Sequence, residues 1–259
     1  MKRITTLAGV ILAVAFSTSA FAVREAAINV LINGLPAVQS QFQFDGDSFS
    51  FTSAPSPFLG DGWSAQIDNF SGVTDPFLSF ALGASNFTSS PITFTFGFTM
   101  PISISGSILA TSALSGSVSA LPDHNGGSAS LGPGLDGNTL LLQALDTDAS
   151  GIQRTKGVDL ADFVPPCTNL VVSCGPLTAS NPSFSGTFSQ MTVNVGFVLS
   201  PFAHASLNGS VTQGLVPEPT TNALMLAGLG LLYFAGRSRR PPRAGALQAS
   251  FLWDSAIRV

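Results

Sequence analysis

Apolar and polar residues alternate strictly through much of the middle of the chain. Phenylalanine takes every second position in residues 41–44, 49–51 and 93–98. Between 102 and 118 the larger apolar residues fall on even positions and a series of serines on odd ones, with Leu109 as the exception. A period of two places alternate side chains on opposite faces of a strand. These runs therefore predict β-strands that bury a face rich in phenylalanine.

The later runs follow the same rule, but with the opposite parity. Apolar side chains take the odd positions in residues 191–199 and again in residues 203–211, whereas Phe188 stands on an even one. A strand cannot exchange its two faces without an extra residue. The pattern therefore predicts a bulge or turn near Ser189 and Gln190.

Turn-forming pairs separate the alternating runs, among them Asp45-Gly46, Asp61-Gly62 and Pro133-Gly134. Many short alternating strands with frequent turns are typical of two packed antiparallel sheets. We therefore expect an all-β fold, an antiparallel β-sandwich of jelly-roll type, over residues 23–213. Residues 123–138 and 146–182 are expected to be irregular, and helix patterns are confined to the two ends.

The N-terminus has the three parts of a secretory signal peptide. Lys2 and Arg3 precede an uncharged, mostly apolar run, and the small residues Ala20 and Ala22 then frame a cleavage site before Val23. This small-x-small spacing is what signal peptidase requires. Residues 1–22 are therefore predicted to be removed on export. The alternative, an N-terminal membrane anchor, is disfavoured because the apolar run is short for a full span.

The C-terminal region combines a proline-glutamate-proline triplet, an uncharged run and an arginine cluster. The uncharged run over residues 219–236 would reach roughly 27 Å as a helix, close to the ~30 Å hydrocarbon core. It predicts a transmembrane helix over about 220–236, with the arginines on the cytoplasmic side. The residues that define the pattern are Val216, Pro217, Glu218, Pro219, Arg237, Arg239 and Arg240.

These elements, in this order, resemble the PEP-CTERM sorting signal, which would occupy residues 214–243. The same kind of tail is also known from the C-terminus of ice-binding proteins. The resemblance implies recognition by an exosortase of a biofilm-forming Gram-negative bacterium and cleavage near the triplet. The alternative is an ordinary single-span anchor with a proline-rich stalk. Residues 244–259 depart from the resemblance, because such proteins usually stop soon after the arginine cluster.

Charge excludes one class of partner. Only 9% of the residues are charged, against about 25% in ordinary soluble domains. Twelve acids and three bases between Val23 and Val216 give the exported part a net charge of −9. Nucleic-acid binding needs clustered Lys and Arg, so we expect no nucleic-acid partner. Serine, threonine, asparagine and glutamine supply the polarity instead, which suits a protein of a surface or matrix.

Cys167 and Cys174 are the two cysteines of the chain. Export makes a disulfide between them the favoured prediction, with two free thiols as the alternative. Their spacing, with no histidine nearby, is poor for zinc. We therefore predict no metal site here.

The sequence contains no recognisable catalytic constellation. His124 lies in a glycine-rich loop and His204 on the polar parity of a strand, and no orienting partner for either can be named from the sequence. The acidic pairs Asp45/Asp47, Asp146/Asp148 and Asp159/Asp162 are either solvated turn acids or loop ligands for calcium, although none completes a calcium-binding loop. Trp63 follows a turn, so it is either a core residue or a partly exposed platform. We predict neither catalytic residues nor a cofactor.

The favoured function is that of an exported, non-catalytic protein with a structural or adhesive role in biofilm or exopolysaccharide. Signal peptidase, an exosortase and, at least transiently, the membrane would be its partners during export, and an exopolysaccharide a partner afterwards. Its location would be the cell surface or extracellular matrix, or the membrane if the tail were retained. A carbohydrate-binding module is the alternative, by analogy with other sandwich folds. An Asp-dependent glycan-active enzyme ranks last.

Overall fold

The computed structural model describes residues 25–52, 57–124, 127–169, 173–216 and 219–238. The chain divides into two compact units, one up to Val216 and one from Pro217 onward. The predicted signal peptide, with Ala20, Ala22 and Val23, lies outside the described residues. So do residues 244–259 and four residues of the sorting pattern, namely Pro217, Glu218, Arg239 and Arg240.

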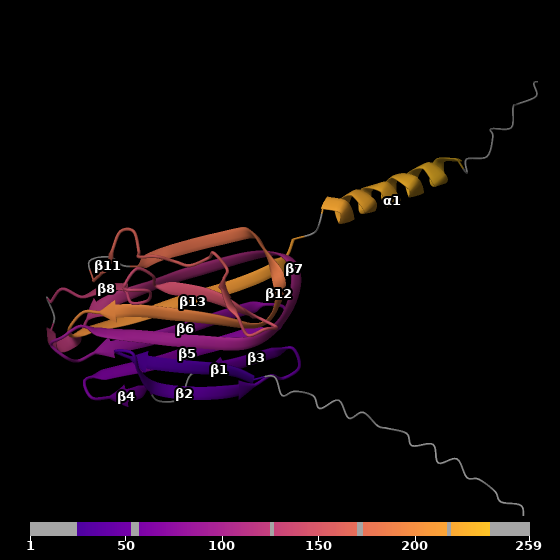
Figure 1. Ribbon diagram of the computed structural model, residues 1–259. Helices are drawn as coiled ribbons and strands as arrows, with labels where there is room; N and C mark the ends of the chain where they lie inside the picture. The colour runs from indigo at the N-terminus through magenta and orange to yellow at the C-terminus, as the bar shows by residue number, and fades with distance from the viewer. Residues whose placement is uncertain (1–24, 53–56, 125–126, 170–172, 217–218, 239–259) are drawn as a thin grey trace, which may run out of the picture. The chain divides into compact units, whose positions relative to one another are not determined.

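The first unit is built from antiparallel strands, which confirms the all-β prediction (Figure 1). Its elements in chain order are β1 (Glu25–Ile32), β2 (Leu35–Gln43), β3 (Ser48–Thr52), β4 (Phe58–Gly60), β5 (Trp63–Val73), β6 (Phe77–Asn86), β7 (Ile92–Ala120), the 3-10 turn η1 (Pro122–His124), β8 (Ser130–Pro133), β9 (Leu142–Asp148), β10 (Gln153–Thr155), β11 (Cys167–Thr168), β12 (Cys174–Leu199) and β13 (Ala203–Leu215).

The two longest strands, β7 and β12, belong to both layers of the sandwich. Residues 92–100 of β7 pair with the second half of β12, and residues 94–99 also pair with β1. Further along, β7 pairs with the first half of β12 and with β13. One layer therefore runs β2-β1-β7-β12-β9-β10 and the other β12-β7-β13-β6-β5-β3.

The strands change layer through bulges and glycines. The register of β12 against β7 shifts between Phe188 and Gln190, which confirms the bulge predicted from the parity change. Close to it, Gly106 pairs with Gly186 and has a φ of 121°, a conformation that favours glycine. A long strand pair can bend at such points without losing its ladder on either side.

β12 begins earlier than the sequence pattern indicated. The expected irregular region extended to residue 182, but β12 starts at Cys174. The sequence pattern did not predict this part of the strand because it contains Pro176 and Pro182, and proline is unfavourable in a central strand. On a free edge proline is tolerated, and this half of β12 pairs with β7 on one side only.

Phenylalanine dominates the core between the two layers. Phe98 of β7 contacts Phe70 of β5, with ring centroids 4.9 Å apart, and stacks on Phe80 of β6 at 5.0 Å. Within one layer, Phe94 of β7 stacks on its cross-strand partner Phe197 of β12. Each fully buried phenylalanine stabilises the fold by roughly 1.5–3 kcal/mol. The contacts of Phe98 with Phe70 and Phe80 therefore hold the two layers together.

Among its described residues, the second unit contains one helix, α1 (Pro219–Ser238), of 20 residues. Its apolar run begins only after Asn222 and ends before Arg237, so it covers residues 223–236. Such a run is about 21 Å long as a helix, short of the ~30 Å hydrocarbon core. Across the described residues, no helix combines the length and the apolar character that a membrane crossing needs. The predicted transmembrane helix over 220–236 is therefore not confirmed.

Candidate ligand cleft and sorting tail

A cleft of about 570 Å³ opens at one end of the sandwich. Three chain segments that are distant in sequence form its walls: the end of β1 with the start of β2, the β4–β5 turn, and the β6–β7 loop. The residues lining it are Ile32, Asn33, Leu35, Pro36, Ala37, Asp61, Trp63, Thr88, Ser90, Pro91 and Ile92. Its volume is in the range typical of small-molecule sites.

Trp63 is the aromatic side chain of this cleft, and it is half-buried. One part of the indole packs against the core. The ring also lies directly against Gly60, where a methyl group would come within 2.1 Å of it. Trp63 is therefore both a core residue and a partly exposed surface, which combines the two interpretations that the sequence left open.

The β6–β7 wall of the cleft is held by Asn86, a fully buried residue. Its side-chain amide donates to the carbonyl oxygen of Ser90 at 2.8 Å, and its Oδ1 accepts from the backbone N–H of Thr88 at 2.9 Å and from the Thr88 hydroxyl at 2.8 Å. The same amide reaches Leu199 and Ser200 at the end of β12. Because this wall is already held in place, it loses little conformational entropy when a ligand binds.

The chemistry of the cleft suits a neutral ligand with hydroxyl groups. Among the described residues of its lining, Asp61 is the one charged residue, and the hydroxyls of Thr88 and Ser90 add polar groups. Leu35 at its rim is 71% exposed. An apolar sugar face can lie against an indole while a carboxylate accepts hydrogen bonds from hydroxyl groups.

A buried ion pair lies elsewhere, in the sandwich core. The Lys156 ammonium is 3.1 Å from Oδ1 of Asp146, and both side chains are fully buried. The Gln213 amide donates to Oδ1 and Oδ2 of Asp146 at 2.8 and 2.7 Å. Burial raises the pKa of Asp146, against the opposing effect of Lys156. Burial also lowers the pKa of Lys156 to about 8.

The two acids of the pair Asp146/Asp148 have different surroundings, although alternation alone would place them on the same face of β9. Asp146 is fully buried, whereas Asp148 is the last residue of β9, beside the register shift at Phe188 and Gln190, and its partly exposed carboxylate binds Arg154 at 3.2 Å. Hydrogen bonds, chiefly from the Ser150 hydroxyl, lower the pKa of Asp148 to about 2. The two carboxylates therefore do not form a joint site, and no sequence signal indicated the partnership of Asp146 with Lys156.

The acids of the other pairs make contacts within turns and, for Asp159, with the strand β9 as well. Asp45 forms a backbone bridge with Ser48. Asp159 accepts hydrogen bonds from the Ala144 N–H and the Thr155 hydroxyl, and Asp162 accepts from the Phe163 N–H at 2.7 Å. Within the described ranges, no three His, Cys, Asp or Glu side chains come together as metal ligands.

His204 has a partner that the sequence did not reveal. Its Nδ1 is 2.9 Å from the hydroxyl of Ser85, which pairs with it across the β13–β6 ladder. Partial burial lowers the pKa of His204, against the opposing effect of Asp68. Ser85 is 119 residues away in the chain, so only the strand register brings the two together. The side chain of His124 lies outside the described residues.

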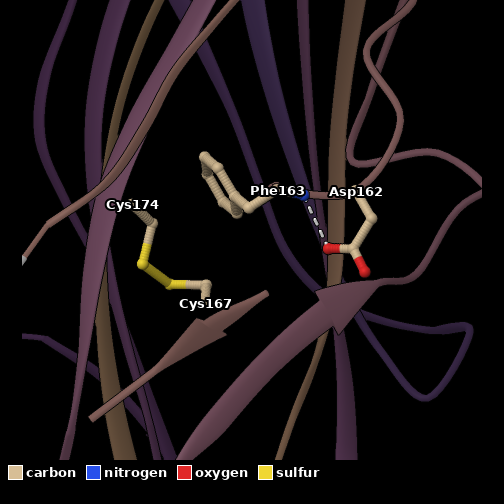
Figure 2. Close-up of a disulfide and its surroundings, with 4 residues drawn as sticks. All are labelled: Asp162, Phe163, Cys167 and Cys174. Atoms are coloured by element: carbon tan, nitrogen blue, oxygen red, sulfur yellow. Dashed lines mark hydrogen bonds between the residues drawn. A yellow bond between two sulfur atoms is a disulfide. The ribbon is translucent and has the colours of Figure 1, made fainter. Parts of the chain in front are cut away.

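Cys167 and Cys174 form a disulfide, with Cα atoms 5.3 Å apart (Figure 2). The bond joins β11 to the first residue of β12 and is buried. Figure 2 shows the ring of Phe163, itself 1% exposed, in the same buried region. The disulfide thus ties the short strand β11 to the start of β12.

The sorting pattern begins where the sandwich ends. The backbone N–H of Val216 donates to the carbonyl oxygen of Ser107 at 2.9 Å, directly after β13. Pro219 is the first residue of α1, and Arg237 lies in its last turn.

Comparison with known proteins assigns this tail. Residues 215–240 match the PEP-CTERM protein-sorting motif, so the chain carries this motif as its residues predicted. The match covers the tail and leaves the sandwich unassigned. No curated protein matches the chain. A solved structure of TmCBM61 in complex with beta-1,4-galactotriose is similar at 6% identity and a TM-score of 0.27, over 60% of this chain and 88% of that one.

Proposed function

We propose that this protein is an exported, non-catalytic component of the cell surface or extracellular matrix, delivered there by an exosortase. The observation that supports the proposal most strongly is the PEP-CTERM motif over residues 215–240, which follows immediately on the last strand of the sandwich. Signal peptidase would act first at Val23, and the exosortase would then act near the triplet at 217–219. The sandwich is the part that reaches the exterior.

The character of the sandwich supports a structural or adhesive role. Its outward faces carry neutral hydroxyl pairs across neighbouring strands, such as Ser71 with Ser79 at 2.8 Å and Ser105 with Thr187 at 2.8 Å. Such surfaces offer many hydrogen-bonding groups to a hydrated polymer and little charge repulsion. The disulfide further suits an oxidising exterior.

The role is tested by complementing a deletion strain with the wild-type gene and with a Pro217→Ala/Glu218→Ala/Pro219→Ala variant. We expect the wild type to restore matrix composition and surface display, whereas the variant stays with the cell. An Asn208→Ala variant, changed on the sheet surface, should behave as the wild type. A deletion strain with unaltered surface and matrix would contradict the structural role.

A neutral polysaccharide is the second candidate partner, and the Trp63 cleft is the observation that favours it. The cleft offers an indole, one carboxylate and two hydroxyl groups, and no cation stands among the described residues that line it, as an anionic polymer would require. Adhesion would then rest on sugar units held at the end of the sandwich, while the hydroxyl-rich faces stay free.

Trp63 also provides the readout for this candidate. In a Trp253→Phe background, Trp63 is the one tryptophan of the chain. We expect a panel of neutral oligosaccharides to include one that shifts its fluorescence, with titration giving a dissociation constant. Binding should weaken at least tenfold in Asp61→Ala, since losing a hydrogen bond to a charged group costs about 1.5–3 kcal/mol. A panel with no binder, or equal binding by Asp61→Ala, would refute the cleft as the site.

A further inference from the structure

β2 lies at the border of the sandwich and pairs with β1 alone among the described strands (Figure 1). Its side away from β1 therefore presents backbone N–H and C=O groups along a strand of nine residues. Such an edge is a template for another strand, and natural proteins usually guard it.

The other edges among the described strands are guarded. β3, β4, β10 and β11 are short, with at most five residues each. The free half of β12 is long, but it contains Pro176 and Pro182, each at a register shift. Short length, proline and irregular register are devices that block pairing with a second sheet.

β2 carries such a device only at its start. Pro36 and the adjoining register shift lie at its first residues, and residues 38–43 then pair regularly with β1. No residue from 26 to 44 is charged, although the exported part as a whole carries −9. Two copies of the chain can therefore approach here without the repulsion that they meet elsewhere.

The side chains of β2 also suit pairing with themselves. Gln39, Gln41 and Gln43 are exposed on one face, while Phe42 turns toward the core and contacts Phe51 at 4.9 Å. Glutamine amides both donate and accept, so stacked glutamines on neighbouring strands can bind one another as the amide ladders of paired sheets do.

We propose that β2 is a self-association edge, which pairs antiparallel with β2 of a second copy of this chain across a two-fold axis. The pairing joins two sheets into one and satisfies the outward backbone groups of both strands. The interface is isologous, because the same strand serves on both sides. It would assemble the protein in pairs independently of any ligand in the Trp63 cleft.

The first test measures the mass of the full chain by analytical ultracentrifugation over a range of concentrations. We expect dimers for the wild type, and a dissociation constant raised at least tenfold by Gln39→Lys/Gln41→Lys, which sets like charges across the axis. The matched control, Ser119→Lys/Asn208→Lys, adds the same charge to exposed positions of the interior strands β7 and β13. Salt at about 1 M should restore the edge variant in part, because the Debye length is then about 3 Å.

Hydrogen exchange supplies a second measurement that needs no variant. The amides of residues 38–43 in the wild type should become more protected as concentration rises, and those of α1 should not. A wild type that stays monomeric, or an edge variant and a control that weaken association equally, would overturn the proposal. Concentration-dependent protection confined to α1 would also overturn it, since the helix would then be the contact.

Discussion

At the scale of single residues, the buried polar contacts are the part of the structure that the sequence predicted least. Lys156 and Asp146 lie in the core, ten residues apart, at positions where no periodic pattern distinguishes an inward acid from a solvated one. His204 and Ser85 meet through strand register alone. Conversely, the positions of the apolar residues were enough to locate the bulge beside Gln190. These residues switch from even to odd positions there, and a strand can keep them on one face only by inserting an extra residue.

The ion pair gives a prediction at this scale. Lys156→Met removes the ammonium and leaves the Asp146 carboxylate buried without its opposite charge, so we expect a loss of about 3–5 kcal/mol in the free energy of unfolding. Urea denaturation measures it. The double variant Lys156→Met/Asp146→Asn keeps an acceptor for Gln213 without the charge, and it should recover most of the loss. A single variant within about 0.5 kcal/mol of wild type would contradict this account of the pair.

At the scale of elements, alternation predicted the strands well but not their lengths. The runs at 93–98 and 102–118 belong to one strand, β7, which continues through Pro101. Proline is normally excluded from the central strands of a sheet. Pro101 is tolerated because it pairs with Gln190 at the bulge, where the ladder is already irregular. The helix α1 of the tail forms over the uncharged run of residues 219–236. Polar residues in its first and last turns make its apolar part shorter than the helix itself.

The disulfide between β11 and β12 gives the prediction at this scale. The bond closes a short loop, for which the chain-entropy model gives about 2.5 kcal/mol. Cys167→Ala/Cys174→Ala should therefore lower the free energy of unfolding by about that amount, as measured by urea denaturation. A reductant should destabilise the wild type equally and leave the variant unchanged. If reductant destabilised both proteins alike, its effect would not come from this bond.

At the scale of the whole molecule, the tail and the sandwich have different roles in this interpretation: the tail concerns sorting and the sandwich concerns binding. The tail matches a sorting motif, which bears on where the chain goes. The sandwich has a Phe-rich core, a cleft at one end and an edge strand at β2. We propose that the cleft and this edge determine what the sandwich contacts after export. That composition suits a surface or matrix stays a prediction, whereas the cleft depends on three distant turns and could not be predicted from the sequence.

We propose that the chain is processed at both ends and that the sandwich is released. The test is the intact mass of the protein from its native host, with the exosortase gene present and deleted. We expect a species that begins at Val23 and ends near residues 217–219, and that is lost on deletion. A species that retains residues up to Val259 in both strains would contradict it.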